Sequence, residues 1–423
     1  MTASLPLASL NARTYQRLFC SEGGRKGTFA GLERAGFRAL PESRRLDLTA
    51  SVVVPCHVTS DAMLNIDRRI NGSRLVATLV GQMNPMCIGG SKAVQLVCRR
   101  ELARKHGCKF EDLGIQPPQF KLDDEADCQA LAAHARADQA WLLKPSSGQK
   151  GAGIRYYKST KAVIAATGDG NCGESTLNQR RGMLAQIYVV PALLGGFKFD
   201  VRAWMLVAST RPLLLFSNQG VVRVAGMPYD SDDSSRLVHV TNAEGQEGTG
   251  SHIRWWQHVD DNLKAAGGPF MQTRFRKQAE RAMRFAALAQ FQRSSGGDGG
   301  GTTAHLGNAH YQVFGCDFII DSALDAHLLE CNGNPTERGP PVMWEEMVAL
   351  LLALHFEPAR LVDADARSAA RPPPPKGTVW SDGPAVKPAL ASLSPGYQFG
   401  SWTLFYNGLV TPVDTYDACH DFG

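Results

Sequence analysis

The fold of this 423-residue chain is decided by residues 311–335, which read YQVFGCDFIIDSALDAHLLECNGNP. Two apolar runs, Val313–Ile320 and Ala326–Cys331, flank a short polar connection, and this pattern predicts a β-hairpin. If the turn is centred between residues 323 and 324, Asp317 and Glu330 lie directly opposite each other. The sequence therefore predicts two facing carboxylates at the end of an otherwise apolar hairpin.

Asn332 lies two residues after Glu330 and shares its face, because side chains alternate along a strand. Two carboxylates that close repel each other, and burial raises their pKa values unless a cation neutralises them. Carboxylate and amide oxygens suit Mg²⁺, which usually shares its shell with substrate phosphates. We therefore expect Asp317, Glu330 and Asn332 to bind Mg²⁺; the alternative is a solvated polar pair on a surface hairpin.

Length and composition indicate a soluble globular protein of two or three domains, since 423 residues exceed one ordinary core. The sequence has no run of about 18 apolar residues, so a membrane span is not expected. The N-terminal sequence MTASLPLASLNAR lacks the basic region and long apolar core of a signal peptide. The ten cysteines form no C-x-x-C pair, which favours reduced, cytosolic thiols that mostly fill the core.

The positive charge is concentrated in the first part of the chain. The net charge is +5, yet residues 1–120 hold 17 Lys or Arg against 9 Asp or Glu. A basic front half predicts an acidic partner, which could be a nucleic acid, an anionic membrane or an acidic peptide. The sequence shows no basic motif interleaved with aromatic residues, so nucleic acid is the less favoured choice. A solvated basic surface is the alternative.

A glycine-rich loop occupies residues 140–158, AWLLKPSSGQKGAGIRYYK, between two expected strands. Gly151 and Gly153 allow backbone amides to approach an anion, while Lys144 and Lys150 supply positive charge. The loop joins strand to strand, so it matches neither the Walker loop nor the dinucleotide fingerprint. Both phosphate binding and a plain flexible turn fit this pattern.

Charged side chains also occupy one face of the expected strand Phe197–Val207. Lys198, Asp200 and Arg202 alternate with apolar residues that face the other way. Charges in a row on a core-bound strand require a ligand or mutual pairing, and both remain open here. Arg223 interrupts a second apolar run in the same manner.

Upstream, Ser91 follows two glycines and is expected to cap a helix whose apolar face contains Ala93, Leu96 and Val97. A second helix is expected over residues 124–139, which are rich in Ala.

Five segments, taken in order, carry a resemblance to a known family. They read LLKPSSGQKGAGI, QIYVVPALLGGFKFDVRAW, GVVRVAGMPY, VHVTNAEGQ and FGCDFIIDSALDAHLLECNGNP, and they fall within residues 140–340. In sequence and spacing they resemble the tubulin tyrosine ligase-like family, a branch of the ATP-grasp ligases. The resemblance implies an α/β (α+β) ATP-grasp fold in which a nucleotide is held between two β-sheets. It divides the chain into an N-terminal subdomain (1–72), a central subdomain (73–185), a C-terminal subdomain (186–360) and a Pro-rich linker with a tail (361–423).

The resemblance also implies roles for individual residues. It assigns phosphate contacts to Lys144 and Lys150 in the loop that contains Gly151 and Gly153. The residues implied at the adenine hinge are Gln186, Tyr188 and Val189; those implied at the nucleotide and reaction centre are Lys198, Asp200, Arg202, Thr241 and Asn242. Arg223 matches the arginine that holds the carboxylate of the incoming amino acid, and Asp317, Glu330 and Asn332 match the magnesium ligands. The catalytic set implied is thus Arg202, Arg223 and Glu330, with ATP and Mg²⁺ as cofactors.

The activity implied by the resemblance is ATP-dependent ligation of a free amino acid to a protein carboxylate through an acyl phosphate. The motif Gly333-Asn334-Pro335 is closest to the tyrosine-adding members, so tyrosine on the C-terminal glutamate of α-tubulin is the leading expectation. Glutamate or glycine ligation, and a catalytically silent nucleotide-binding module that docks on microtubules, are the alternatives. Ile187 and Asn218-Gln219 depart from the family pattern, at the adenine side and in the substrate pocket respectively. We further expect a monomer that binds the acidic tail of tubulin, with neither nucleic acid nor membrane as a partner. The expected location is the cytoplasm, in association with the cytoskeleton, cilia and flagella included.

Overall fold

The computed structural model describes most of the chain beyond residue 85. The described residues are 86–134, 139–148, 151–210, 212–241, 252–265, 268–294, 310–333, 335, 341–356, 361, 390–412 and 419, with short pieces at 18–20, 30–31, 33–34, 38–39, 52–53 and 79–81. Lys150, Asn242 and Asn334 lie outside this set. No helix in the described part combines the length and the apolarity that a bilayer crossing needs.

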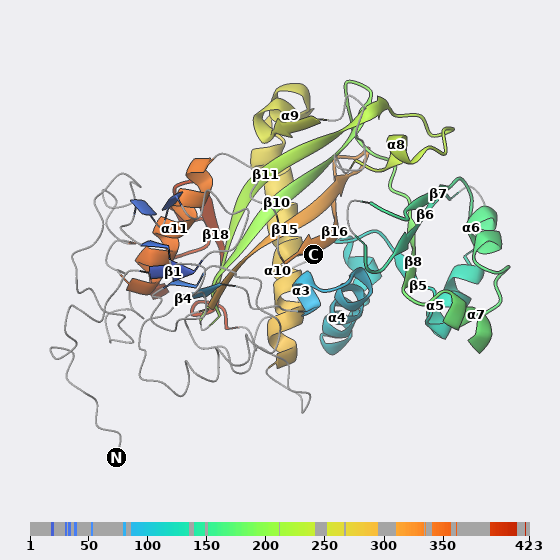
Figure 1. The fold of residues 1–423 in the computed structure, drawn as a ribbon, viewed down its shortest axis with the longest axis horizontal. Coiled ribbons are helices and arrows are strands. Elements are labelled where there is room, and N and C mark those ends of the chain that lie inside the picture. The colour runs from blue at the N-terminus through green and yellow to red at the C-terminus, as the bar shows by residue number, and fades with distance from the viewer. Residues whose placement is uncertain are drawn as a thin grey trace, which may run out of the picture.

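Three long antiparallel strands form the centre of the larger sheet (Figure 1). They are β10 (Phe197–Thr210), β11 (Leu213–Pro228) and β15 (His310–Ile320), in the order β11-β10-β15. The sheet continues at its sides through β1 (Leu18–Cys20), β2 (Arg38–Ala39), β3 (Val52–Val53), β4 (Leu79–Gly81), β9 (Leu193–Leu194), β12 (His252–Trp255), β16 (Ala326–Asn332), β17 (Gln398–Phe399) and β18 (Trp402–Asn407).

A smaller four-stranded sheet lies at the other end of the molecule, at the right of Figure 1. Its order is β5 (Gln119–Lys121), β8 (Met183–Ile187), β6 (Trp141–Pro145) and β7 (Arg155–Tyr157). Three short helices belong to this part: α5 (Glu125–Ala132), α6 (Thr160–Ala166) and α7 (Glu174–Gln179). Two further strands, β13 (Lys264–Ala265) and β14 (Gly268–Pro269), pair with each other and form a separate small sheet. Two separate sheets of this kind are what the ATP-grasp prediction requires.

Helices cover both faces of the larger sheet, because β10 buries apolar side chains on each side. Ala203 and Met205 pack into one core with α10 (Arg276–Ser294), whereas Trp204 and Leu206 pack into another with α11 (Pro341–Phe356). Further helices in the described part are α3 (Met86–Gly89), α4 (Lys92–Lys105), η3 (Phe110–Leu113), α8 (Arg236–His239), α9 (Trp256–Asn262) and the π-helical turn η5 (Met271–Phe275). The charged first half of β10 is thereby left facing the smaller sheet.

The hairpin β15–β16 places Asp317 opposite Glu330, as the sequence predicts, but by a different route. Its turn is centred one half-residue earlier, since Ile319 pairs with His327. That register alone would place Leu329 opposite Asp317. A bulge between the two pairings shifts the partner by one residue and brings Glu330 into line.

The prediction of reduced, unpaired thiols is wrong for eight of the ten cysteines. Disulfide bonds join Cys87 to Cys98, Cys108 to Cys419, Cys128 to Cys172 and Cys316 to Cys331. Spacing along the chain could not reveal them, because the partners meet only after folding; one pair is 311 residues apart.

The helix predictions are confirmed in part. Ser91 caps α4, since its Oγ accepts a hydrogen bond from the Val94 amide at 3.4 Å. Leu96 is buried as expected, but Val97 is 41% exposed, so that part of the predicted apolar face is wrong. The helix expected over residues 124–139 is the shorter α5, and residues 135–138 lie outside the described set.

The four-part division of the chain stays a prediction. The boundary expected between residues 185 and 186 falls inside β8, and β18, expected in the tail, pairs with β11 in the larger sheet.

Candidate active site

A cavity of about 790 Å³, which includes the open solvent at its mouth, lies between the two sheets. Lys144 and Gln186 reach it from the smaller sheet, and Asp200, Arg223 and Asp317 reach it from the larger one. The other lining residues that the sequence singled out are Gly151, Tyr188, Val189, Lys198, Thr241 and Glu330. Three predicted residues, Gly153, Arg202 and Asn332, are not part of this wall.

Two arginines and two aspartates form one network, of which Asp200, Arg223 and Asp317 line the cavity and Arg202 lies behind them. Arg202 donates to both carboxylate oxygens of Asp317, from Nε at 2.7 Å and from Nη2 at 2.8 Å. Arg223 donates from Nε to Asp200 at 2.5 Å and lies 3.2 Å from Asp317 through Nη2. Two of the three charges on this strand face, Asp200 and Arg202, thus pair with charges on the neighbouring strands β11 and β15 rather than with each other.

These pairs control the charge state of the buried groups. Burial by itself would raise the pKa of Asp317, but Arg223 and Arg202 hold it below its usual value. Burial would lower the pKa of Arg223, but Asp200 and Asp317 raise it above the ordinary value. The network therefore holds two guanidinium groups beside the cavity, and the two aspartates balance their charge.

Lys198 is the one predicted residue of this strand face that pairs with no carboxylate in the described structure. Its Nζ donates to the Tyr188 hydroxyl at 3.1 Å and to the His239 carbonyl at 2.8 Å, and it lies 4.4 Å from the centre of the Tyr188 ring. Burial lowers the pKa of Lys198 to about 7, although Asp200 opposes this shift. A buried ammonium with neutral partners is suited to an anion that arrives in the cavity.

Lys144 has a similar environment on the smaller sheet. It is 5% exposed, and its Nζ donates to Oε1 of Gln186, which also accepts from Gln119 at 3.0 Å. Burial lowers the pKa of Lys144 to about 7, with Lys92 as a further cause. Two lysines from opposite sheets thus face the same space with their charge weakly compensated.

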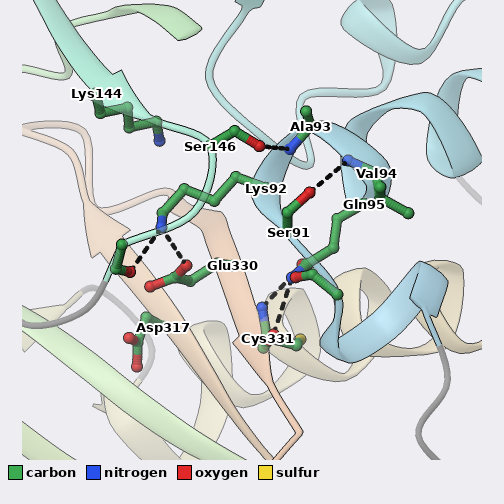
Figure 2. Close-up of polar contacts among 12 residues, drawn as sticks. Ser91, Lys92, Ala93, Val94, Gln95, Lys144, Ser146, Asp317, Glu330 and Cys331 are labelled. Carbon is green, nitrogen blue, oxygen red and sulfur yellow. Dashed lines mark hydrogen bonds and ion pairs between the residues drawn. The ribbon is translucent and has the colours of Figure 1, made fainter. Parts of the chain in front are cut away.

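Lys92, at the start of α4, is a charged cavity residue that the sequence analysis missed. Its Nζ lies 3.0 Å from Oε2 of Glu330 (Figure 2) and donates to the carbonyl of Gly148 at 3.4 Å. The loop after β6 is tied to the same helix end, because Ser146 accepts from the amides of Lys92 at 3.0 Å and Ala93 at 3.3 Å. The signal was the Gly89-Gly90-Ser91 helix start, which places the next side chain at the first turn.

The glycine-rich loop lies close to neighbouring side chains. Gly151 has φ of +68°, and a Cβ at this position would lie 2.7 Å from Cγ1 of Val240. Gly153 has φ of +74°, and a Cβ there would lie 2.8 Å from Cγ of Pro145. Both positions therefore require glycine, for backbone geometry as well as for any ligand. At the far wall the Thr241 hydroxyl donates to Oδ2 of Asp200.

The magnesium ligand set can be tested against these positions. Asp317 faces Glu330 across the hairpin, and Asn332 pairs with Gly315 two residues further on the same face. The predicted ligand set consists of two carboxylates and one amide. Within the described part, no three His, Cys, Asp or Glu side chains lie close enough together to hold a metal ion by themselves. Hard oxygen donors in this number fit Mg²⁺ that shares its shell with phosphate oxygens. That these residues bind the metal stays a prediction.

Two residues that depart from the family pattern, Ile187 and Asn218, do not line the cavity. Ile187 packs in the core of the smaller sheet, and its amide donates to the carbonyl of Pro118 at 3.0 Å. Asn218 donates from Nδ2 to the carbonyl of Ser401 at 3.0 Å and to its Oγ at 2.9 Å. Neither side chain touches the network of arginines and aspartates described above.

Comparison with known sequences identifies the family. The model of the tubulin-tyrosine ligase family matches residues 92–343, more than half of the chain. The chain belongs to this family. The matched region begins at Lys92 and contains every site residue discussed above.

Curated relatives are similar to a third to a half of the chain. The mouse protein polyglycylase TTLL10 is 27% identical over 243 residues, 52% of this chain and 33% of its own length. Its human counterpart, named an inactive polyglycylase, is 25% identical over 241 residues, 52% of this chain and 34% of its own length. The mouse tubulin polyglutamylase TTLL13 is 30% identical over 158 residues, 34% of this chain and 18% of its own length. The matched part of the chain thus spans about a third or less of these relatives.

Proposed function

We propose that this protein is an ATP-dependent ligase that joins a free amino acid to a carboxylate of an acidic protein, with tubulin as the acceptor. The observation that carries this proposal is the convergence, in one cavity between two sheets, of two buried lysines, a paired arginine centre and two facing carboxylates. The side chains of Lys92, Lys144 and Lys198 suit the phosphates of ATP. The two carboxylates suit the Mg²⁺ that accompanies ATP. The arginines suit the carboxylates that take part in the reaction.

The reaction that this arrangement supports has two steps. An acceptor carboxylate oxygen attacks the γ-phosphorus of ATP, so that an acyl phosphate forms and ADP leaves. The amine of the free amino acid then attacks the acyl carbon, loses a proton and displaces inorganic phosphate. No side-chain nucleophile is needed, because positioning and charge stabilisation lower the barrier.

Residues of this chain supply the charges for both steps. Arg202 and Arg223 carry fixed positive charge where negative charge develops on the transferring group and on the tetrahedral oxyanion. The charge on the phosphate oxygens is neutralised by Lys144 of the smaller sheet, Lys198 of the larger sheet and Lys92 of α4. When bound, Mg²⁺ supplies further neutralisation of the phosphate charge.

Glycine or glutamate is the amino acid that we favour. The relatives described above are named polyglycylases and polyglutamylases, which supports these amino acids over tyrosine, the leading expectation from the Gly333-Asn334-Pro335 motif. The human relative is named inactive, so a nucleotide-binding protein without ligase activity is the second candidate.

One assay separates these candidates. Purified protein is incubated with tubulin, Mg²⁺-ATP and radiolabelled glycine, glutamate or tyrosine in parallel, with detyrosinated tubulin as a second acceptor. Label from glycine or glutamate supports the proposal, and label from tyrosine alone moves the protein to tyrosine ligation. ATP binding without label from any of the three overturns ligase activity on tubulin.

A further inference from the structure

The outer edge of β16 is held at Cys331 by one side chain. β16 pairs with β15 on one side, and within the described residues no strand pairs with its other side. At Cys331 the amide donates to Oε1 of Gln95 at 3.0 Å, and the carbonyl accepts from Nε2 of Gln95 at 2.9 Å (Figure 2). The side-chain amide thereby replaces a neighbouring strand at the residue between Glu330 and Asn332.

The amide of Gln95 has its full set of hydrogen bonds. Its side chain comes from α4, whose first residue is Lys92, and Gln95 is 2% exposed. Besides the two bonds to Cys331, Nε2 donates to the carbonyl of Gly90 at 2.8 Å and Oε1 accepts from Nη2 of Arg99 at 2.9 Å. Two donated and two accepted bonds exhaust the capacity of an amide group, so the orientation of Gln95 is fixed.

Arg99 is the residue that fixes which way the amide faces. It is fully buried, and its guanidinium donates to two amide oxygens, those of Gln95 and Gln116. Among the described residues it forms no ion pair. Burial lowers the pKa of Arg99 to about 10, and the charge of Glu330 opposes this shift. Since a guanidinium only donates, the oxygen of Gln95 must face it, which leaves Nε2 for the Cys331 carbonyl.

We propose that Gln95, oriented by Arg99, is a positioning residue that fixes the strand at Cys331 and so places Glu330 and Asn332 for a divalent metal bound with nucleotide phosphates. This inference rests on the nucleotide and metal site of the proposed function. Lys92, which pairs with Glu330, comes from the same helix as Gln95. The helix α4 therefore positions both the backbone of β16 at Cys331 and the cation that pairs with the Glu330 carboxylate. The residue acts through the backbone and touches neither substrate nor metal.

The other end of the same strand offers a matched control. Oε1 of Gln278 accepts from the Ala326 amide at 2.9 Å, so this second glutamine also caps the outer edge of β16. It lies at the turn end of the hairpin, away from Glu330. Gln278→Met removes this edge hydrogen bond and the bond that Nε2 donates to Oδ1 of Asp325, but it leaves the two bonds between Gln95 and Cys331 in place.

The test measures nucleotide binding rather than ligation. Affinity for ATP is determined by calorimetry with excess Mg²⁺ and again with EDTA, for the unaltered protein, Gln95→Met and Gln278→Met. We expect Gln95→Met to weaken Mg²⁺-dependent binding by about 10- to 100-fold, the range found when a partner of a metal ligand is lost, and to leave binding in EDTA within about twofold. Hydrogen exchange of the peptide that contains Cys331 should also accelerate in Gln95→Met alone.

Several outcomes would overturn the inference. Equal Mg²⁺-dependent affinity in Gln95→Met and the unaltered protein would do so, as would an equal loss in Gln278→Met. If Gln95→Met does not fold, Gln95→Glu keeps both accepted bonds and removes the two donated ones, and it must show the same selective loss. Failure of the proposed function is distinct, because it would appear as intact Mg²⁺-ATP binding by the unaltered protein without amino-acid ligation.

Discussion

Asp317 and Glu330 face each other across one hairpin, yet each is paired with a cation from a different part of the chain. Asp317 binds Arg202 of the neighbouring strand, whereas Glu330 binds Lys92 at the start of a helix more than two hundred residues earlier. Arg223 and Arg202 hold the pKa of Asp317 below its usual value, so this carboxylate stays ionised opposite Glu330 before any ligand arrives.

Replacement of Glu330 by Gln should abolish Mg²⁺-ATP turnover while the hairpin remains folded. The amide keeps the size of the side chain but loses the charge that faces Lys92. We expect ADP release in the presence of acceptor and amino acid to fall by at least about 100-fold, as when a preorganised charge is removed. Unchanged turnover in Glu330→Gln would refute the metal assignment of the hairpin.

Replacement of Arg223 by Ala should cost both stability and ligation. It leaves Asp200 and Asp317 buried without their shared partner, and breaking a buried pair in this way costs about 3–5 kcal/mol. Chemical denaturation measures the free energy of unfolding, and ligation is followed at a temperature where the variant is folded. Arg223→Lys keeps a charge but not the fork geometry, so it should recover stability more than activity. Normal ligation by folded Arg223→Ala would show that this arginine holds no substrate carboxylate.

Lys92 should contribute to nucleotide affinity. Lys92→Met removes a charge from the cavity, and a hydrogen bond to a charged group is worth about 1.5–3 kcal/mol. Binding of ATP should therefore weaken by about 10- to 100-fold in calorimetry. Lys105→Met is the matched control, because Lys105 lies at the exposed last turn of the same helix and should change affinity by less than about twofold. Equal effects of the two variants would remove Lys92 from the site.

Nucleotide binding should take up protons above neutral pH. Burial lowers the pKa values of Lys144 and Lys198 to about 7, so both are mostly neutral at pH 8 in the free protein. A bound triphosphate favours the charged forms and raises these pKa values, so affinity is fully present below about pH 7 and falls as pH rises through the raised values. Calorimetry at pH 8 in buffers of different ionisation enthalpy should report net proton uptake. Binding enthalpies that do not depend on the buffer would contradict proton uptake on nucleotide binding.

The Cys316–Cys331 disulfide should stabilise the hairpin that contains both carboxylates. It closes a loop with a sequence separation of 15, for which chain entropy predicts about 3 kcal/mol. The double replacement Cys316→Ala with Cys331→Ala should lower the free energy of unfolding by about this amount in non-reducing buffer. The comparison is repeated with a thiol reductant, where the gap between the two proteins should narrow. If the difference in free energy of unfolding is unchanged in the reductant, the lost stability comes from side-chain packing and not from the disulfide.

The local elements of the site follow from the sequence alone. Alternation of side chains placed Lys198, Asp200 and Arg202 on one face of a strand, and the glycine start before Ser91 placed a helix cap. These features depend on neighbours along the chain, so the backbone period of strand or helix is enough to reveal them. The family motifs, kept in order, implied the two-sheet fold that the structure has.

The partners of those residues were decided only by the tertiary structure. The pairing of Glu330 with Lys92, the hold of Gln95 on Cys331 and the disulfide between Cys108 and Cys419 each join residues that are distant in sequence. Even the alignment of Asp317 with Glu330 depends on a bulge that moves the register by one residue. No periodicity encodes such contacts, because they arise when sheets and helices pack and buried polar groups must find partners.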